Sequence, residues 1–280
     1  MKNIPRVPTG FAGLDRILEG GLPAGSLNLL SGACGTGKST FAMQFLYYGA
    51  KYLNEPGVYV TLEEEPEKLV RNMSLFGWDI ADLIKRKKML VIKPEVYKFD
   101  SIKQIMEDAI EKIGAKRLVV DSYSVMLTYF SDPYEIRNGL VQLDRGIIKM
   151  QCTALVISDI KDNSEIFSTT GVEEFIVDGV IVLYLVKNPG NPRETQRLIS
   201  VRKMRATNHP LKAYPYEISG NGINIKNMGL SHSKYRVVAA VPRPREAQKK
   251  ERRSAKKAST VDLQSLRTHR SAHSWKWKHL

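Results

Sequence analysis

Cysteine is scarce in this chain of 280 residues, which contains only Cys34 and Cys152. Two cysteines cannot build the disulfide framework of a small secreted domain, and their spacing fits no zinc motif. The chain also lacks an apolar run near the roughly 20 residues that cross a bilayer. Its first stretch, interrupted by Pro5 and Pro8, has no signal-peptide pattern. We therefore expect a soluble protein of the reducing cytoplasm, with no membrane insertion.

Acidic residues are few in the last part of the chain. Residues 230–280 hold 14 lysine and arginine residues and three acidic ones, against 43 and 29 in the whole chain. The preceding residues are thus nearly balanced in charge. We predict a globular domain over 1–229 and a basic, solvated or disordered tail over 230–280. The tail's cations, with Trp275 and Trp277, are suited to nucleic acid. An acidic protein surface, or no partner at all, are the alternatives.

One glycine-rich segment carries the most specific motif. Residues 32–39, Gly-Ala-Cys-Gly-Thr-Gly-Lys-Ser, match the G-x4-G-K-[ST] pattern of a phosphate-binding P-loop. The apolar run 27–30 before them indicates a buried strand, and residues 40–52 after them indicate a helix. That order lets backbone N–H groups surround a phosphate at a helix N-terminus. The alternative is a glycine-rich turn that only joins a strand to a helix.

The P-loop pattern gives most of its residues a role. Lys38 would reach the β- and γ-phosphates, and the Ser39 hydroxyl would bind Mg²⁺. The predicted nucleotide-binding residues of this segment are Gly32, Gly35, Thr36, Gly37, Lys38, Ser39 and Thr40. A nucleotide with Mg²⁺ is therefore the expected ligand.

The rest of the sequence to residue 229 alternates strands with helices. Beyond a short helix within 9–25, strands are predicted at 57–62, 89–92, 116–121 and 153–158, and helices at 66–76, 101–113 and 133–150. Strands 179–186 and 197–202 flank a turn at 188–192. This alternation predicts an α/β fold: a mostly parallel sheet flanked by helices on both faces, with an antiparallel hairpin at one edge.

Nucleotide hydrolysis also needs carboxylates near the phosphates. Asp121 closes an apolar strand, as a Walker B aspartate does, and is the predicted second Mg²⁺ ligand; a simple loop cap is the alternative. Glu63 and Glu64 follow the strand after the P-loop helix. If that strand lies beside the P-loop strand, one of them would face the γ-phosphate and activate water. We favour Glu63 without excluding Glu64, and helix-dipole decoration is the alternative for both.

Several motifs together resemble the KaiC-like branch of the RecA-superfamily ATPases, over about residues 6–229. They are the segment from Thr9-Gly10 to Gly25, the P-loop, Glu63-Glu64, Phe76-Gly77-Trp78-Asp79, Asp121-Ser122, Gly171-Val172-Glu173-Glu174-Phe175, and Lys203-Met204-Arg205-Ala206-Thr207-Asn208-His209. The last two distinguish this branch from other P-loop proteins.

The resemblance implies a ring, typically a hexamer, with ATP bound between subunits. Lys203 and Arg205 would then act in trans on the neighbour's γ-phosphate, and we expect both side chains on one face of a strand. A solvated edge strand with two unrelated cations is the alternative. The resemblance also implies nucleotide contacts at Met204, Thr207, His209 and Ser219. Ala206 stands where the family often has glycine, which would stiffen this turn.

Three functions remain open. The first is a slow ATPase that acts as a nucleotide-driven regulatory switch with a protein partner. The second is a RecA/RadA-like DNA-dependent ATPase of recombination or repair. Residues 159–174 argue against it, because they hold Asp159, Asp162, Glu165, Glu173 and Glu174 against Lys161 alone. The third is a nucleotide-gated scaffold whose basic tail binds nucleic acid.

Overall fold

The computed structural model describes residues 4–95, 98–130, 132–161, 164–188 and 190–225. The predicted tail at 230–280 lies outside these ranges, as does Asp162. Among the described residues, no helix is both long enough and apolar enough to cross a membrane.

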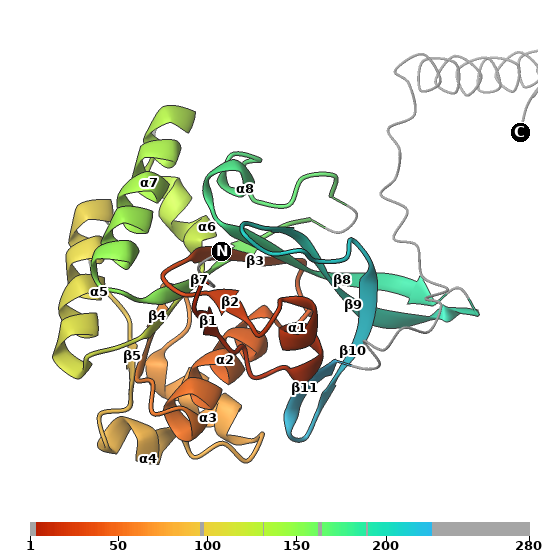
Figure 1. Cartoon of the computed structure of the whole chain (residues 1–280), viewed down its shortest axis with the longest axis horizontal. Helices are drawn as coiled ribbons and strands as arrows, with labels where there is room; N and C mark the ends of the chain where they lie inside the picture. Colours follow the sequence, from red (N-terminus) through yellow and green to blue (C-terminus); the bar gives the residue numbers. More distant parts are fainter. Residues whose placement is uncertain (1–3, 96–97, 131, 162–163, 189, 226–280) are drawn as a thin grey trace, which may run out of the picture. The chain divides into compact units, whose positions relative to one another are not determined.

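A nine-stranded sheet forms the centre of the fold, in the order β11-β10-β9-β8-β3-β7-β6-β4-β5 (Figure 1). The parallel strands are β3 (Leu27–Gly32), β4 (Gly57–Thr61), β5 (Met89–Ile92), β6 (Arg117–Asp121), β7 (Thr153–Asp159) and β8 (Gly179–Asn188). The antiparallel strands at one edge are β9 (Asn191–Met204), β10 (Ala213–Ser219) and β11 (Gly222–Ile225). The predicted α/β architecture with an antiparallel edge is confirmed.

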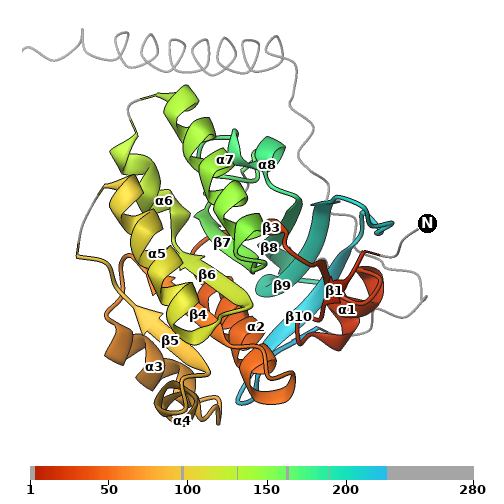
Figure 2. The ribbon, with the colours of Figure 1, turned by 60° about the vertical axis from the view of Figure 1, so that its left-hand side comes forward.

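Helices cover both faces of the sheet (Figures 1 and 2). One face carries α1 (Ala12–Ile17), α2 (Lys38–Tyr52), α3 (Pro66–Ser74) and α4 (Ile80–Lys85). The other carries α5 (Phe99–Ile113), α6 (Tyr123–Met126), the 3₁₀ turn η1 (Leu127–Tyr129) and α7 (Pro133–Lys149). Successive strand residues feed the two cores alternately, so that Leu30 packs under α2 whereas Leu29 packs on the opposite face.

The order of the strands differs from one expectation. The sequence analysis placed one of Glu63 and Glu64 at the γ-phosphate on the condition that β4 lies beside β3. That condition is wrong, because β7 and β6 separate the two strands. A crossover helix can carry the chain over one strand or several, and the local sequence does not specify which.

Most predicted boundaries lie within two residues of the observed ones. Helix α2 begins at Lys38 because Gly37, with φ of +88°, occupies its N-cap. The main exception is β9, whose first residues are polar and exposed and therefore lack the apolar alternation that marks a strand. The elements absent from the prediction are β1 (Arg6–Val7), β2 (Leu22–Pro23), α4, α6, η1, α8 (Glu173–Ile176), β10 and β11, of which all but the seven-residue β10 have six residues or fewer.

A fully buried arginine links the start of β6 to α2. The Arg117 Nε donates to Glu55 Oε2 at 2.8 Å, and Nη1 donates to the Phe45 carbonyl at 2.9 Å. The guanidinium carbon also lies 4.5 Å from the centre of the Phe45 ring. Gly49 leaves room for this group, since a Cβ there would lie 2.2 Å from Arg117 Nε. This cluster fixes α2, and hence the P-loop, against the middle of the sheet.

The Phe76-Gly77-Trp78-Asp79 motif has a structural use. Trp78 stacks on Tyr47 of α2, with ring centres 5.5 Å apart. Asp79 accepts hydrogen bonds from Tyr47 Oη at 2.9 Å and from Lys51 Nζ at 2.5 Å. The motif therefore anchors the start of α4 to α2.

Candidate nucleotide-binding site

The loop between β3 and α2 forms a cradle for an anion. Gly35 and Gly37 have φ of +79° and +88°, which residues with a side chain rarely adopt. Gly32 is also constrained, since a Cβ there would lie 2.6 Å from Thr36 Oγ1. Gly37 has no side chain to cap α2, so the N–H groups of the first helical turn are available to a phosphate. The loop therefore fits the polyphosphate of a nucleotide.

Lys38 lies across this loop. Its Nζ is 3.0 Å from Asp159 Oδ1 at the end of β7 and donates to the Ala33 carbonyl at 3.1 Å. The Thr36 hydroxyl donates to the same carbonyl at 2.8 Å. The ammonium group is therefore already held at the loop, and its charge is balanced by one partly exposed carboxylate.

Ser39 and Asp121 lie together, as the P-loop mechanism requires. The Asp121 carboxylate accepts a hydrogen bond from the Tyr59 hydroxyl. Burial raises the pKa of Asp121, and the nearby hydroxyls of Tyr59 and Ser39 oppose the shift. Burial also raises the pKa of Tyr59 well above its usual value, so its phenol remains a donor. A hydroxyl and a carboxylate oxygen are the hard ligands that Mg²⁺ prefers, so this pair fits the ion.

The structure separates Glu63 from Glu64. Partial burial raises the pKa of Glu63, the charges of Asp159 and Asp121 raise it further, and Lys38 lowers it. The Glu63 carboxylate thus shares the electrostatic environment of the P-loop lysine and of the predicted Mg²⁺ ligand.

Glu64 turns toward α3 instead. Its Oε1 accepts a hydrogen bond from Asn72 Nδ2 at 3.2 Å and lies 3.4 Å from Lys68 Nζ. The turn that carries both glutamates is fixed at its backbone, where Lys93 Nζ donates to the Glu63 carbonyl at 3.2 Å. The two adjacent carboxylates therefore have different surroundings.

Besides Asp159, two residues that the sequence motifs did not indicate contact the P-loop. Arg197 of β9 donates to the Gly35 carbonyl from Nε at 3.3 Å and from Nη2 at 3.2 Å. The Tyr216 hydroxyl of β10 donates to the Thr36 carbonyl. The only signal for Arg197 in the sequence is that it is a cation at the start of a predicted strand. Nothing in the sequence places that part of the strand beside the P-loop.

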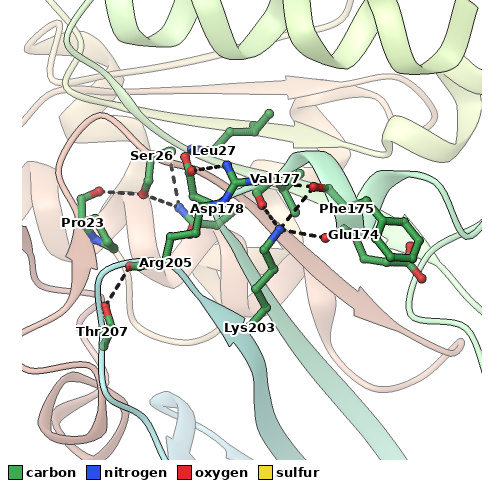
Figure 3. Close-up of polar contacts among 11 residues, drawn as sticks. Pro23, Ser26, Leu27, Glu174, Phe175, Val177, Asp178, Lys203, Arg205 and Thr207 are labelled. Carbon is green, nitrogen blue, oxygen red and sulfur yellow. Dashed lines mark hydrogen bonds and ion pairs between the residues drawn. The ribbon is translucent and has the colours of Figure 1, made fainter. Parts of the chain in front are cut away.

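Lys203 and Arg205 meet at the opposite end of β9 (Figure 3). The Lys203 Nζ donates to the Val177 carbonyl at 2.6 Å, just beyond α8. The Arg205 Nη1 lies 3.0 Å from Asp178 Oδ1. Both side chains also donate to the Phe175 carbonyl at 3.4 Å. Burial and the charge of Arg205 lower the pKa of Lys203. The two cations therefore lie close together, where both side chains reach one backbone carbonyl.

The other predicted nucleotide contacts divide between the two ends of β9. Met204 is buried, so its side chain belongs to the core. Thr207 and His209 follow directly after Arg205. Ser219 is the last residue of β10, three residues after Tyr216, which reaches the P-loop. Ser219 and Thr207 therefore do not face the same nucleotide within one subunit.

The strand register sets the distance between the two parts of the site. Met204 pairs with Gly179, and Gly179 pairs with Asn28 near the start of β3. The P-loop begins only at Gly32, four residues further along β3. At about 3.3 Å per residue, the two levels are about 13 Å apart, before the loop itself is counted. The cations at 203 and 205 thus lie at the far end of the sheet from their own P-loop.

The acidic count of residues 159–174 overstates the charge on their surface. Glu173 is fully buried and accepts from the Thr170 hydroxyl at 2.6 Å. Glu174 accepts from the Ser168 hydroxyl and from the Phe167 N–H. Asp159 pairs with Lys38. Two of these carboxylates thus bond to their own loop and a third pairs with the P-loop lysine, so they are a weaker barrier to nucleic acid than the sequence suggested.

Comparisons with known proteins agree with this fold. The family model for the KaiC ATPase matches residues 7–229. The circadian clock oscillator protein KaiC of Parathermosynechococcus lividus is 36% identical over 239 residues, which cover 82% of this chain and 44% of that protein. A UPF0273 protein of Methanocaldococcus jannaschii is 39% identical over 235 residues, covering 78% of this chain and 95% of that protein.

A solved structure is also similar. The crystal structure of a KaiC-like protein from the hyperthermophilic archaeon Pyrococcus horikoshii matches with a TM-score of 0.73 and 38% sequence identity. The match covers 80% of this chain and all of that one.

A P-loop between the central strand and its helix, in a mostly parallel sheet with an antiparallel edge, defines a RecA-like nucleotide-binding fold. Within that class, the chain belongs to the KaiC ATPase family. It spans about half the length of the KaiC proteins that it matches and nearly all of the UPF0273 relative.

Proposed function

We propose that this protein binds and hydrolyses ATP in a homo-oligomeric ring, in which Lys203 and Arg205 act on the nucleotide of the neighbouring subunit. Its slow turnover would serve as a switch that a protein partner senses. The observation that carries the proposal is the separation described above: about 13 Å of sheet between these cations and the level of their own P-loop. Arg205 has 54% of its side chain exposed and can therefore meet another subunit.

Each residue of the P-loop side then has a role. Lys38 exchanges Asp159 for the β- and γ-phosphates, and the N–H groups from Gly35 to Ser39 bind the phosphate oxygens. Glu63 accepts the proton of the attacking water or orients that water, for which its carboxylate must be ionised. Arg197 and Tyr216 hold the loop through its carbonyls.

Ser39 and Asp121 would hold Mg²⁺, because their oxygens already lie together. When bound, the ion would neutralise charge on the phosphates. Tyr59 keeps the Asp121 carboxylate oriented through its hydroxyl.

The regulatory role draws on the relatives, several of which are named circadian clock oscillator proteins. A DNA-dependent ATPase of the RecA/RadA type is the second candidate for the core. A DNA-stimulated rate of phosphate release would favour this second candidate over the regulatory switch.

Light scattering coupled to size exclusion, with and without ATP and Mg²⁺, tests the ring. Phosphate release is measured in parallel on the wild type, Lys38→Ala and Arg205→Ala. We expect an ATP-stabilised oligomer, with hydrolysis lost in both variants. Loss of one arginine finger lowers hydrolysis by about 10³-fold in related phosphoryl-transfer systems. A monomer whose hydrolysis is unaffected by Arg205→Ala would overturn the trans arrangement and leave a P-loop ATPase acting alone.

We also propose that the tail at 230–280 binds polyanions such as single-stranded nucleic acid, because it holds 14 cationic and three acidic residues with two tryptophans. Ending the chain at Met228 tests this, as residues up to Ile225 include the whole described fold. Oligonucleotide binding that persists unchanged in the shortened chain would reject the tail as the binding segment.

A further inference from the structure

The N-terminal strand reaches the turn that follows Arg205. Arg6 of β1 donates from Nη1 to Thr207 Oγ1 at 2.6 Å and from Nη2 to the Ala206 carbonyl at 2.8 Å. The Thr207 hydroxyl in turn donates to the Arg205 carbonyl at 3.2 Å (Figure 3). A continuous chain of hydrogen bonds therefore runs from the Arg6 guanidinium to the backbone of Arg205.

This turn needs support from outside its own residues. Ala206 has φ of +53°, the left-handed region that glycine enters freely and that alanine disfavours. Without a partner, the peptide units at 205–207 would lower their free energy by returning to an ordinary conformation. That return would rotate the backbone that carries the Arg205 side chain. The Ala206 carbonyl that Arg6 holds belongs to the strained residue itself.

The two sides of Arg205 have separate anchors. On the strand side, its N–H donates to the Asp178 carbonyl at 2.9 Å. On the turn side, only Arg6 among the described residues brings a side chain from outside the turn to Ala206 and Thr207. Arg6 is itself fixed, because β1 pairs with β2 and the Arg6 Nη2 lies 3.1 Å from Glu19 Oε2. Its side chain is 17% exposed; the hydrogen bond to Thr207 is partly buried, and the one to the Ala206 carbonyl lies at the surface.

We propose that Arg6 is a positioning residue: it holds the Ala206–Thr207 turn so that Arg205 points at the nucleotide of the neighbouring subunit. This inference rests on the proposed trans action of Arg205. Arg6 itself would contact neither the nucleotide nor the water molecule that attacks it. It would act through Thr207 and Ala206.

Three single substitutions test the role. Arg6→Met keeps the apolar stem and removes the guanidinium, and we expect kcat for phosphate release to fall about tenfold because a small misplacement of a catalytic group is costly. The KM for ATP should change little, since the P-loop is untouched. Arg6→Lys should be intermediate, because one ammonium group cannot replace the two-donor fork. The matched control is Arg86→Met at the C-cap of α4, where Arg86 pairs with Asp82; α4 lies beside β5, the edge strand opposite β11.

A second-site substitution separates positioning from a general loss of structure. Glycine adopts the φ of residue 206 without strain, so Ala206→Gly lowers the turn's need for Arg6. We expect Ala206→Gly to restore kcat at least about threefold in the Arg6→Met background, while changing the wild type less. A kcat defect that glycine leaves untouched, or that follows only a lower melting temperature, would overturn the proposal.

Mixed oligomers distinguish a failure of the Arg6 proposal from a failure of the trans mechanism on which it rests. Lys38→Ala subunits lack a working P-loop and keep an intact Arg6 and Arg205. Mixing them with Arg6→Met subunits should restore hydrolysis in the latter, as it should for Arg205→Ala subunits. If hydrolysis recovers in the mixture with Arg205→Ala but not in the mixture with Arg6→Met, the proposed role of Arg6 is rejected and the trans mechanism stands. No recovery with Arg205→Ala would reject the trans mechanism, and the role of Arg6 with it.

Discussion

Glu63 and Glu64 offer a matched pair of substitutions that tests the proposed chemistry. Glu63 has its pKa raised by burial and by Asp159 and Asp121, and lowered by Lys38, so its carboxylate lies within reach of the phosphate site's charges. Glu64 is held by Asn72 and Lys68 on α3. Glutamine has the same shape as glutamate but cannot take up a proton from water. Glu63→Gln and Glu64→Gln therefore differ only in which carboxylate they remove.

The expected magnitude follows from the role of each group. A general base contributes about 10²- to 10⁴-fold, so Glu63→Gln should lower kcat about 100-fold or more, or about 2.7 kcal/mol in the activation barrier. Its KM for ATP should stay within about threefold, because Lys38 and the loop N–H groups still bind the phosphates. Glu64→Gln loses an exposed ion pair and should stay within about twofold of the wild type.

The pH dependence gives an independent readout. The raised pKa of Glu63 means that its carboxylate takes up a proton at a higher pH than an ordinary glutamate does. Because the base must be ionised, kcat should fall as the pH is lowered through that raised pKa. The acid limb should disappear in Glu63→Gln and persist in Glu64→Gln. Equal residual rates in the two variants, or an unchanged acid limb in Glu63→Gln, would refute the assignment.

Three further predictions concern the scaffold and the resting site. Arg117→Met should lower the free energy of unfolding by about 2–4 kcal/mol in urea titrations, below the usual cost of breaking a buried pair because Glu55 is 30% exposed; Arg86→Met is the control, expected within about 0.5 kcal/mol. Gly49→Ala should cost about 1–3 kcal/mol by crowding Arg117, and clearly less in an Arg117→Ala background, where a double-mutant cycle measures the coupling. Asp159→Asn should tighten Mg²⁺-free ATP binding about three- to tenfold in calorimetry, since Lys38 no longer exchanges a carboxylate for the phosphates; unchanged or weaker binding would contradict this.

Local signals in the sequence predict the phosphate loop and the parallel sheet well. The P-loop pattern at 32–39 and the apolar runs before Gly32 and Asp121 depend on backbone conformation and burial, which neighbouring residues largely determine. Strand order is different. The displacement of β4 from β3 by two strands depends on how crossover helices pack on the sheet, and no residue within β4 records it. The short strands β1 and β2 hold too few residues to show a period.

The candidate site shows the same division at the level of single residues. The sequence indicated that Lys203 and Arg205 share a face, but it could not indicate at which end of the sheet that face lies. The answer comes from the pairing of Met204 with Gly179 and of Gly179 with Asn28. That register places Lys203 and Arg205 about 13 Å along the sheet from the level at which their own P-loop begins.

Arg6 is a stronger case of the same kind. It lies 201 residues from Thr207 in the sequence, and its partner at Ala206 is a backbone carbonyl, which has no side-chain identity to detect. What the sequence does contain is the alanine at 206, a residue unsuited to positive φ. A local conflict of this kind predicts that some distant group stabilises the turn, and the structure identifies that group as Arg6. Strained residues beside candidate sites are therefore a rational place to look for positioning residues that motifs do not contain.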